Sequence, residues 1–343
     1  MFKKKLAFLL GIMVCLSIAG YVACLLAGGT KQIKAKEEFL LVTSFYPMYV
    51  LAENLINGID GMNVSNLTEN QTGCLHDYQL TPRDMKLLSG ADAFLINGAG
   101  MELFVEKIIE NYSELPMIDA SYGISLLQGV EHTHGEEASA EEEHNHEEEY
   151  TTEQEHNHGH NHETEHLHAE NGHVWMDVER YRQQLFAVKD KLQELVPEAA
   201  EALENAAVTY DVSLQALLEE VKALHRGTEG MPVVIFHEAF AYLADSLGME
   251  VLHALSLDEE TVPSAGEIAE VMEEINHHGG ALLLIEPDYA EYADKIVAET
   301  EARVVYLNPL TTGDGSPNSY VTGMQSNLEA IRGVLESENN NVK

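Results

Sequence analysis

The sequence predicts an α/β protein of two lobes, each with a mostly parallel sheet, joined by a long rigid strut helix. Short β-branched and apolar runs alternate with stretches of helical spacing before residue 120, and the same alternation returns after residue 230. Strands that alternate with helices in this way are typical of parallel sheets covered by helices. Between these regions lies an amphipathic stretch long enough to cross a small domain. The 343 residues are enough for two domains of ordinary size.

We expect the first lobe to span residues 38–130. Its predicted strands and helices are strands at 38–44, 62–67, 92–96 and 117–118, and helices at 48–56, from 82 onward and up to 109. Thr81, Pro82 and Asp84 favour a helix start, because the threonine side chain can cap the first turn and proline suits the first helical position.

Two helices are expected between the lobes. Apolar residues step by three and four from Tyr181 to Leu195 and again from Leu203 to Leu224, with Pro197 between the two series. We assign residues 173–197 to a return helix of the first lobe and residues 198–229 to the strut. About 25 helical residues would span ~38 Å. A coiled-coil dimer is the alternative, but alanine and tyrosine in the seam favour a strut within a monomer.

The second lobe is predicted at residues 230–343. Its predicted elements are strands at 232–236, 251–252, 281–285 and 303–307, and helices at 238–247, 264–277 and 319–335. Ser264 and Glu267 form a capping-box pattern at the start of one of these helices.

Residues 1–23 are predicted to be a signal peptide. Lysines at positions 3–5 precede a long apolar run, which is the pattern of a secretory signal. Tyr21-Val22-Ala23-Cys24 is similar to a bacterial lipobox, so we expect Cys24 to be lipidated and residues 24–37 to form a tether. The run is also long enough to remain uncleaved as a membrane anchor. Both alternatives place the protein outside the cytoplasm, at the outer face of the cell membrane or in the periplasm.

The net charge of −39 excludes nucleic acid as a partner, since nucleic-acid binding requires a basic face. A strongly negative field attracts cations instead. The charge therefore favours a cationic ligand.

Residues 131–172 form a histidine- and glutamate-rich tract that we expect to be a disordered loop. The stretch from Glu131 to Trp175 holds eleven of the 17 histidines and has almost no apolar residues to bury. Short tracts of this composition are typical of metal binding, because imidazole is a good zinc ligand. The alternative is a solvated acidic linker. The ten candidate accessory ligands within the tract are His132, His134, His144, His146, His156, His158, His160, His162, His166 and His168.

Three other histidines occupy positions that suit a metal site. His237 directly follows a predicted buried strand, at the carboxyl end where open α/β sheets bind ligands. His76 lies in a predicted loop of the first lobe, and His173 lies where the tract returns to ordered sequence. Three imidazoles would make a zinc site with one open position. For any one of them, an ordinary core or surface histidine is the alternative.

Around these histidines the sequence resembles the zinc-binding substrate-binding proteins of metal-uptake ABC transporters, a family that also has manganese-binding members. The motifs are GCLHDYQLTPRD at 73–84, NGAGME at 97–102, HVWMD at 173–177 and FHEAFAY at 236–242. The resemblance implies two Rossmann-like lobes with a metal site in the cleft between them. It also implies His76, His173 and His237 as the ligands, and histidine at the third position is typical of zinc members.

Asn308 departs from the family pattern. Leu307-Asn308-Pro309-Leu310 is similar to a segment that commonly has aspartate at the second position, where the aspartate can be a fourth ligand. A neutral amide is a poor zinc ligand, so Asn308 is expected to be either a weak fourth ligand or a residue of the cleft.

The function that the resemblance implies is capture of Zn²⁺ outside the cytoplasm and its delivery to an ABC permease and, through it, the ATPase. No reaction is then catalysed. One alternative is a surface metal buffer or adhesin that uses the tract itself. Another is a three-histidine zinc hydrolase. The HExxH match at 162–166 lies in the tract that is expected to be disordered, and His237-Glu238 is followed by alanine and phenylalanine, so no such motif falls on a predicted helix, which disfavours the hydrolase.

Overall fold

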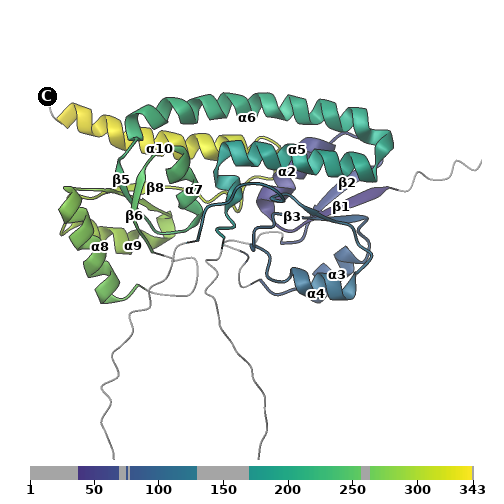
Figure 1. Cartoon of the computed structure of the whole chain (residues 1–343), viewed down its shortest axis with the longest axis horizontal. Coiled ribbons are helices and arrows are strands. Elements are labelled where there is room, and N and C mark those ends of the chain that lie inside the picture. Colours follow the sequence, from purple (N-terminus) through teal and green to yellow (C-terminus); the bar gives the residue numbers. More distant parts are fainter. Residues whose placement is uncertain (1–37, 69–74, 76–77, 130–169, 256–262, 342–343) are drawn as a thin grey trace, which may run out of the picture. The chain divides into compact units, whose positions relative to one another are not determined.

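Two four-stranded sheets form the framework of the chain (Figure 1). The computed structural model describes residues 38–68, 75, 78–129, 170–255 and 263–341, with side chains as far as residue 337. The described residues from Leu40 onward belong to one compact unit, and ahead of it only Glu38 and Phe39 are described. The predicted signal peptide, the tether with Cys24 and the histidine-rich tract up to residue 169 lie outside the described residues.

The first sheet has the strand order β2-β1-β3-β4. Its strands are β1 (Phe39–Thr43), β2 (Met62–Asn66), β3 (Ala93–Ile96) and β4 (Met117–Asp119), and the helices that follow them in this part of the chain are α2 (Tyr46–Ile56), α3 (Pro82–Leu88) and α4 (Val105–Asn111). β3 runs parallel to both β1 and β4, with Phe94 opposite Val42 on one side and Met117 on the other. The alternation in the sequence therefore predicted this sheet correctly.

The second sheet repeats the same order, as β6-β5-β7-β8. Its elements are β5 (Pro232–Ile235), α7 (Ala239–Ser246), β6 (Glu250–Ala254), α8 (Ala265–His278), β7 (Leu282–Ile285), α9 (Ala290–Val297), β8 (Arg303–Tyr306) and α10 (Ser319–Asn341). All three strand pairs are parallel. The Ser264–Glu267 capping box at the start of α8 is present, as predicted. Helix α9 was not predicted, and it begins after a short 3-10 turn, η3 (Pro287–Tyr289).

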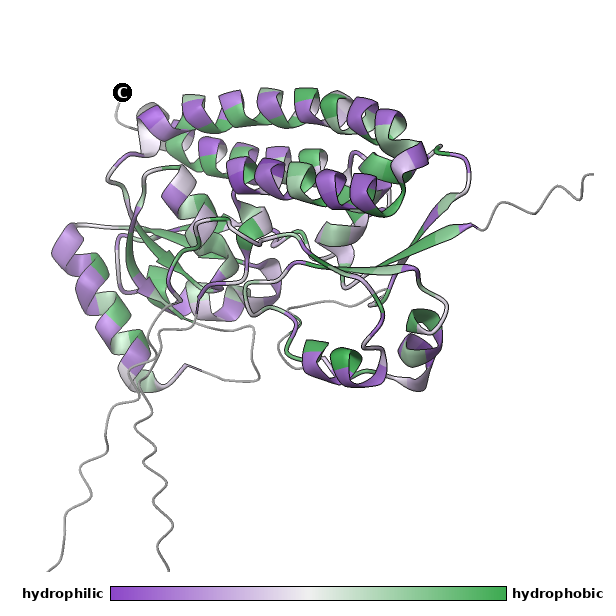
Figure 2. Ribbon diagram, turned by 45° about the vertical axis from the view of Figure 1, so that its right-hand side comes forward, coloured by the Kyte–Doolittle hydropathy of each residue, from purple (hydrophilic) through white to green (hydrophobic). Residues whose placement is uncertain are grey.

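The segment between the sheets forms two packed helices. They are α5 (Val178–Leu195) and α6 (Ala200–Thr228), separated by a 3-10 turn at Pro197–Ala199. The predicted apolar series from Leu203 to Leu224 is buried along α6. Figure 2 shows hydrophilic and hydrophobic residues alternating along this helix, as an amphipathic helix requires. Helix α6 packs against α5, against α2 of the first sheet and against α10, which in turn packs on β8. The strut is thus in contact with helices of both sheets.

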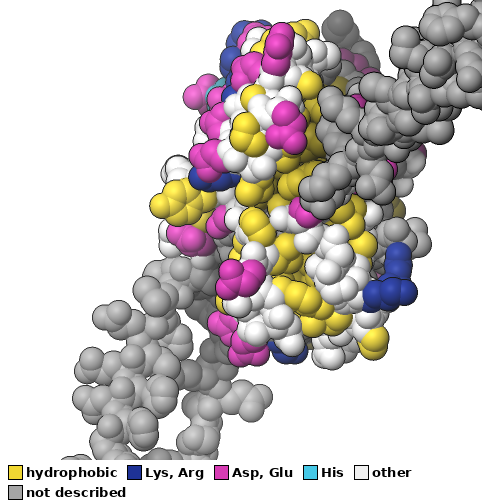
Figure 3. All heavy atoms as spheres, turned by 90° about the vertical axis from the view of Figure 1, so that its right-hand side faces the viewer, with side chains coloured by type: hydrophobic (Ala, Val, Ile, Leu, Met, Phe, Trp, Pro, Cys, Tyr) yellow, Lys and Arg dark blue, Asp and Glu magenta, His cyan; other side chains and the backbone are white. Residues whose placement is uncertain are grey.

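The surface carries the acidic character of the sequence. In the view of Figure 3, acidic side chains lie scattered over the face and basic side chains are found at few places. Within the described ranges, no helix is both long enough and apolar enough to cross a membrane.

Candidate metal centre

His173 is held in place by a buried turn. His173 directly precedes the 3-10 turn η1 (Val174–Met176), whose three side chains are fully buried. Trp175 anchors the turn, because its indole Nε1 donates to the Pro309 carbonyl at 2.8 Å and its own carbonyl accepts from the Tyr320 hydroxyl at 2.8 Å. These two partners belong to the second-sheet part of the chain. The His173 side chain is itself only 1% exposed.

His237 lies two residues beyond the end of β5, just ahead of α7. Phe236, directly before it, is fully buried in the core of the second sheet, and His237 is 2% exposed. The carboxyl end of a central parallel strand is the position at which such sheets bind ligands.

The two predicted ligands are brought together. The ring centroids of His173 and His237 are 5.0 Å apart, and the ring planes are nearly perpendicular, at 88°. Zn–N bonds are about 2.0–2.1 Å long, so two imidazoles bound tetrahedrally to one zinc ion have ring centres about 5 Å apart. The spacing of this buried pair therefore fits a shared zinc ion.

Each imidazole has an oxygen atom beside its Nδ1. His173 Nδ1 lies 2.9 Å from Asn171 Oδ1, and His237 Nδ1 lies 2.7 Å from Glu286 Oε1. An oxygen acceptor at Nδ1 favours the tautomer with its hydrogen there, which leaves Nε2 as the nitrogen that could bind a metal. A carboxylate beside Nδ1, as Glu286 is for His237, is the kind of partner that makes an imidazole a stronger metal ligand.

Asn171 and Glu286 were not identified from the sequence. Glu286 directly follows β7, the neighbour of β5, so its position at the carboxyl edge of the sheet was the available signal. Asn171 lies at the return of the tract, where a single asparagine carries no local pattern.

The buried carboxylate of Glu102 supports the segment before His173 through Asn97. Glu102 accepts from the Ser44 hydroxyl and the Asn97 backbone N–H, both at 2.7 Å, and burial raises the pKa of its carboxyl group to about 7. Asn97 in turn donates through its side chain to the Gly172 carbonyl at 2.8 Å. The chain at His173 is therefore fixed to the end of β3.

The third predicted ligand, His76, lies outside the described residues, although its flanks are described. Leu75 is fully buried, and the Tyr78 hydroxyl donates to Asp84 at 2.7 Å. Asp84 also forms a capping box with Thr81 at the start of α3, where the sequence predicted a helix start. Within the described ranges, no three histidine, cysteine, aspartate or glutamate side chains form a group that could hold a metal ion.

Asn308 has a role in local structure. Its Oδ1 accepts from the Leu310 backbone N–H at 2.7 Å, and Leu310 has a positive φ of 62°, so this bond stabilises a strained turn. Its backbone N–H donates to Asn327 at 2.9 Å. Asn308 and Glu286 line one cavity of about 370 Å³. Asn308 therefore shares a cavity with the residue that contacts His237 Nδ1.

Comparison with known proteins identifies the family of the chain. Residues 41–334 match the family model of the zinc-uptake complex component A, periplasmic (ZnuA). The chain belongs to this family.

Two curated relatives show the extent of the similarity. The high-affinity zinc uptake system protein ZnuA of Brucella abortus is 30% identical over 296 residues, which cover 83% of this chain and 88% of the relative. The zinc-binding lipoprotein AdcA of Streptococcus pneumoniae is 26% identical over 332 residues, 95% of this chain. The chain spans less than two thirds of the streptococcal relatives, 61% of this one and 57% of AdcA from Streptococcus pyogenes.

Solved structures share the fold. The SBP FpvC of Pseudomonas aeruginosa in complex with Ni²⁺ matches with a TM-score of 0.69 at 19% identity, covering 88% of this chain and 98% of FpvC. At this level of identity the match establishes the α/β fold with its two sheets.

Proposed function

We propose that the protein binds Zn²⁺ outside the cytoplasm and delivers it to the permease of an ABC transporter. The ATPase of that transporter drives uptake. The observation that carries this proposal is the buried pair His173 and His237, with ring centres 5.0 Å apart and an oxygen acceptor at each Nδ1. Membership of the zinc-uptake family supports it. The zinc ion is cargo, and the chain catalyses no reaction on it.

His76 is the proposed third ligand. Its motif at 73–84 supports the assignment, and three imidazoles suit zinc better than manganese. We assign the ligands His76 and His173 to a first lobe at residues 38–130 and 173–197, and His237 to a second lobe at residues 230–343, linked by the strut at 198–229.

The histidine-rich tract is the proposed accessory that gathers zinc near the site. Gln128, just before the tract, and Glu170, near its end, pair in an antiparallel bridge. The two described ends of the tract are therefore neighbours, and Glu170 is three residues ahead of His173. This arrangement supports a supply of zinc to the site from the ten histidines between positions 132 and 168.

Attachment to the membrane is proposed to occur through Cys24. The name of the pneumococcal relative, a lipoprotein, supports lipidation over an uncleaved anchor. Cys24→Ser should release the protein from the membrane fraction, and continued membrane attachment of this variant would favour the anchor.

Growth in zinc-poor medium tests the transport proposal. Deletion of the gene should prevent growth, and the wild-type chain should restore it. His237→Ala should fail to restore growth, whereas a chain without residues 132–168 should restore it in part. Full rescue by His237→Ala, at equal protein level, would contradict the proposal and favour a metal buffer that uses the tract.

A further inference from the structure

Asn171 joins His173 to the helix that follows His237. Its Oδ1 accepts from the His173 backbone N–H at 3.0 Å and lies 2.9 Å from His173 Nδ1. Its Nδ2 donates to the carbonyl oxygen of Glu238 at 3.0 Å, directly ahead of α7. With 1% exposure, Asn171 is as buried as the histidine that it contacts.

These partners determine the orientation of the Asn171 amide. If the amide were turned over, its Nδ2 would face the His173 backbone N–H, a second donor. Its Oδ1 would then face the Glu238 carbonyl, a second acceptor. Only the observed orientation satisfies both sides. Because an amide oxygen can only accept, His173 Nδ1 carries a hydrogen, and in the neutral ring Nε2 then has the lone pair.

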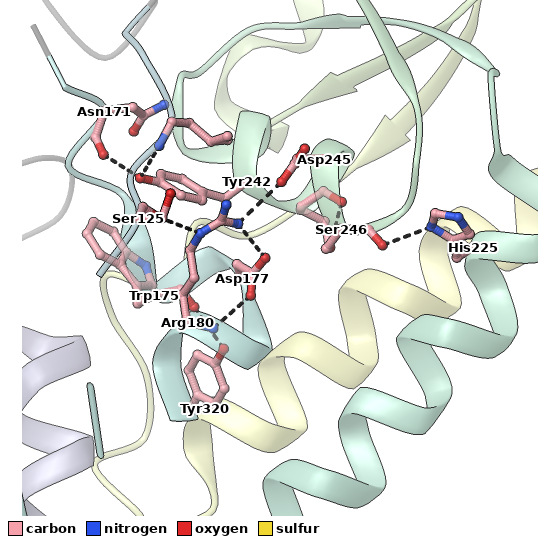
Figure 4. A network of polar contacts seen from close by, with 12 residues as sticks. Ser125, Asn171, Trp175, Asp177, Arg180, His225, Tyr242, Asp245, Ser246 and Tyr320 are labelled. Carbon is pink, nitrogen blue, oxygen red and sulfur yellow. Dashed lines mark hydrogen bonds and ion pairs between the residues drawn. The ribbon is translucent and has the colours of Figure 1, made fainter. Parts of the chain in front are cut away.

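The backbone of Asn171 is fixed from the same side. The Tyr242 hydroxyl of α7 donates to the Asn171 carbonyl at 2.8 Å and accepts from the Leu127 backbone N–H at 3.1 Å. The Arg180 guanidinium lies 5.1 Å from the centre of the Tyr242 ring (Figure 4). Arg180 also pairs with Asp177 at 2.7 Å and with Asp245 at 3.3 Å, which holds the start of α5 against α7.

We propose that Asn171 is a positioning residue for zinc binding that selects the Nδ1–H tautomer of His173 and ties this imidazole to α7. The inference rests on the proposed zinc site. One frame, made of Asn171 and the first turns of α7, then sets the orientation of His173 relative to His237. The pair is therefore pre-organised before zinc arrives, which lowers the cost of binding.

Two substitutions separate positioning from a structural role. Asn171→Leu and Asn171→Asp both remove the donor to Glu238, but only aspartate keeps an acceptor for His173 Nδ1. We expect the leucine variant of the full-length chain to bind zinc about 10–100-fold more weakly in a chelator competition. The aspartate variant should lose clearly less than the leucine variant, because it loses the bond to Glu238 but keeps the acceptor for His173 Nδ1. Tyr242→Phe, which removes only the hydroxyl, should cost less than Asn171→Leu. Equal losses for leucine and aspartate would overturn the proposal.

The tautomer can be measured in the wild-type chain itself. In long-range ¹H–¹⁵N spectra of the zinc-free protein, the His173 signals are those that His173→Ala removes. We expect the Nδ1–H pattern, and an Nε2–H pattern would overturn the proposal whether or not the Asn171 variants fold.

His173→Ala also separates failure of this inference from failure of the zinc site. If His173→Ala binds zinc as the wild type does, the proposed function at this site is wrong. If His173→Ala loses zinc while a folded Asn171→Leu binds it normally, only the role of Asn171 is wrong.

Discussion

His173 and His237 have similar burial but partners of different charge. One is 1% exposed with a neutral amide at its Nδ1, and the other is 2% exposed with a carboxylate at its Nδ1. Both partners orient the ring, because both place an oxygen acceptor beside the same nitrogen. Only Glu286 is a carboxylate, and a carboxylate partner is expected to make an imidazole a stronger metal ligand. The difference suggests that the amide supplies orientation alone, while the carboxylate supplies orientation and ligand strength.

The origin of the partners differs as well. Asn171 lies two residues from His173 but is itself held by Glu238 and Tyr242. Glu286 approaches His237 from the next strand of the same sheet. We infer that the orientation of His173 depends on contacts between the two sheet regions, whereas that of His237 depends on one sheet.

Removal of a ligand should have the largest effect. His237→Ala should weaken zinc binding by more than the roughly 10–100-fold that loss of a ligand's hydrogen-bond partner costs. Deletion of residues 132–168 should weaken this site far less, because the deleted segment contains none of the three proposed ligands. Calorimetric titration at pH 7 compares the two variants, and equal losses of the high-affinity step would contradict the assignment of the site.

Glu286→Gln tests the difference between the two partners directly. Glutamine keeps an oxygen acceptor for His237 Nδ1 but removes the charge, so His237 would then be held as His173 is. We expect about a tenfold loss of zinc affinity with no change of tautomer. Unchanged affinity would mean that Glu286 only orients the His237 ring, and that its charge does not strengthen zinc binding.

Glu102→Gln is the matched control for that substitution. Glu102 is a buried carboxylate that supports the segment before His173 through Asn97 and the Gly172 carbonyl, whereas Glu286 lies at the ring of His237 itself, so replacement of Glu102 should cost clearly less zinc affinity than replacement of Glu286. If Glu102→Gln lost as much zinc affinity as Glu286→Gln, the effect would not be specific to the carboxylate at His237 Nδ1. The proposed difference between Asn171 and Glu286 would then be unsupported.

The same variant should change how stability depends on pH. Burial raises the pKa of Glu102 from 4.5 to about 7, so the folded state holds this proton more tightly than the unfolded state. The contribution to stability is complete below about pH 4.5 and is lost as pH rises through 7, by at most on the order of 3 kcal/mol. Urea unfolding at pH 5 and pH 8 should show a smaller loss of stability for Glu102→Gln than for wild type. A loss at least as large in the variant would contradict this account.

The sequence predicted the framework well, and it singled out two histidines that the structure brings together. The strands were found because their apolar runs are short and bounded by turns, and α6 because its apolar series from Leu203 to Leu224 has unbroken helical spacing. His237 was found because it directly follows such a run. Helix α9 was missed, since only a few of its residues, such as Ala293 and Ile296, are buried.

The pairing of each histidine with its partner could not be predicted from the sequence, although the position of Glu286 directly after a strand was a signal. Glu286 is 49 residues from His237, and Glu238 is 67 residues from Asn171. Each of these residues is an ordinary polar side chain in its own segment. They become partners only when the fold brings β5, β7 and the return of the tract together, which no local pattern encodes.

The position of the bound ion tests the central claim most directly. Crystals of the zinc-loaded full-length chain, measured at the zinc absorption edge, should show one strong anomalous peak about 2.0–2.1 Å from Nε2 of both His173 and His237. The Asn171 and Glu286 side chains should remain at the Nδ1 atoms. A fully loaded protein with no zinc between these two rings, or with zinc bound to an Nδ1 atom, would contradict the account.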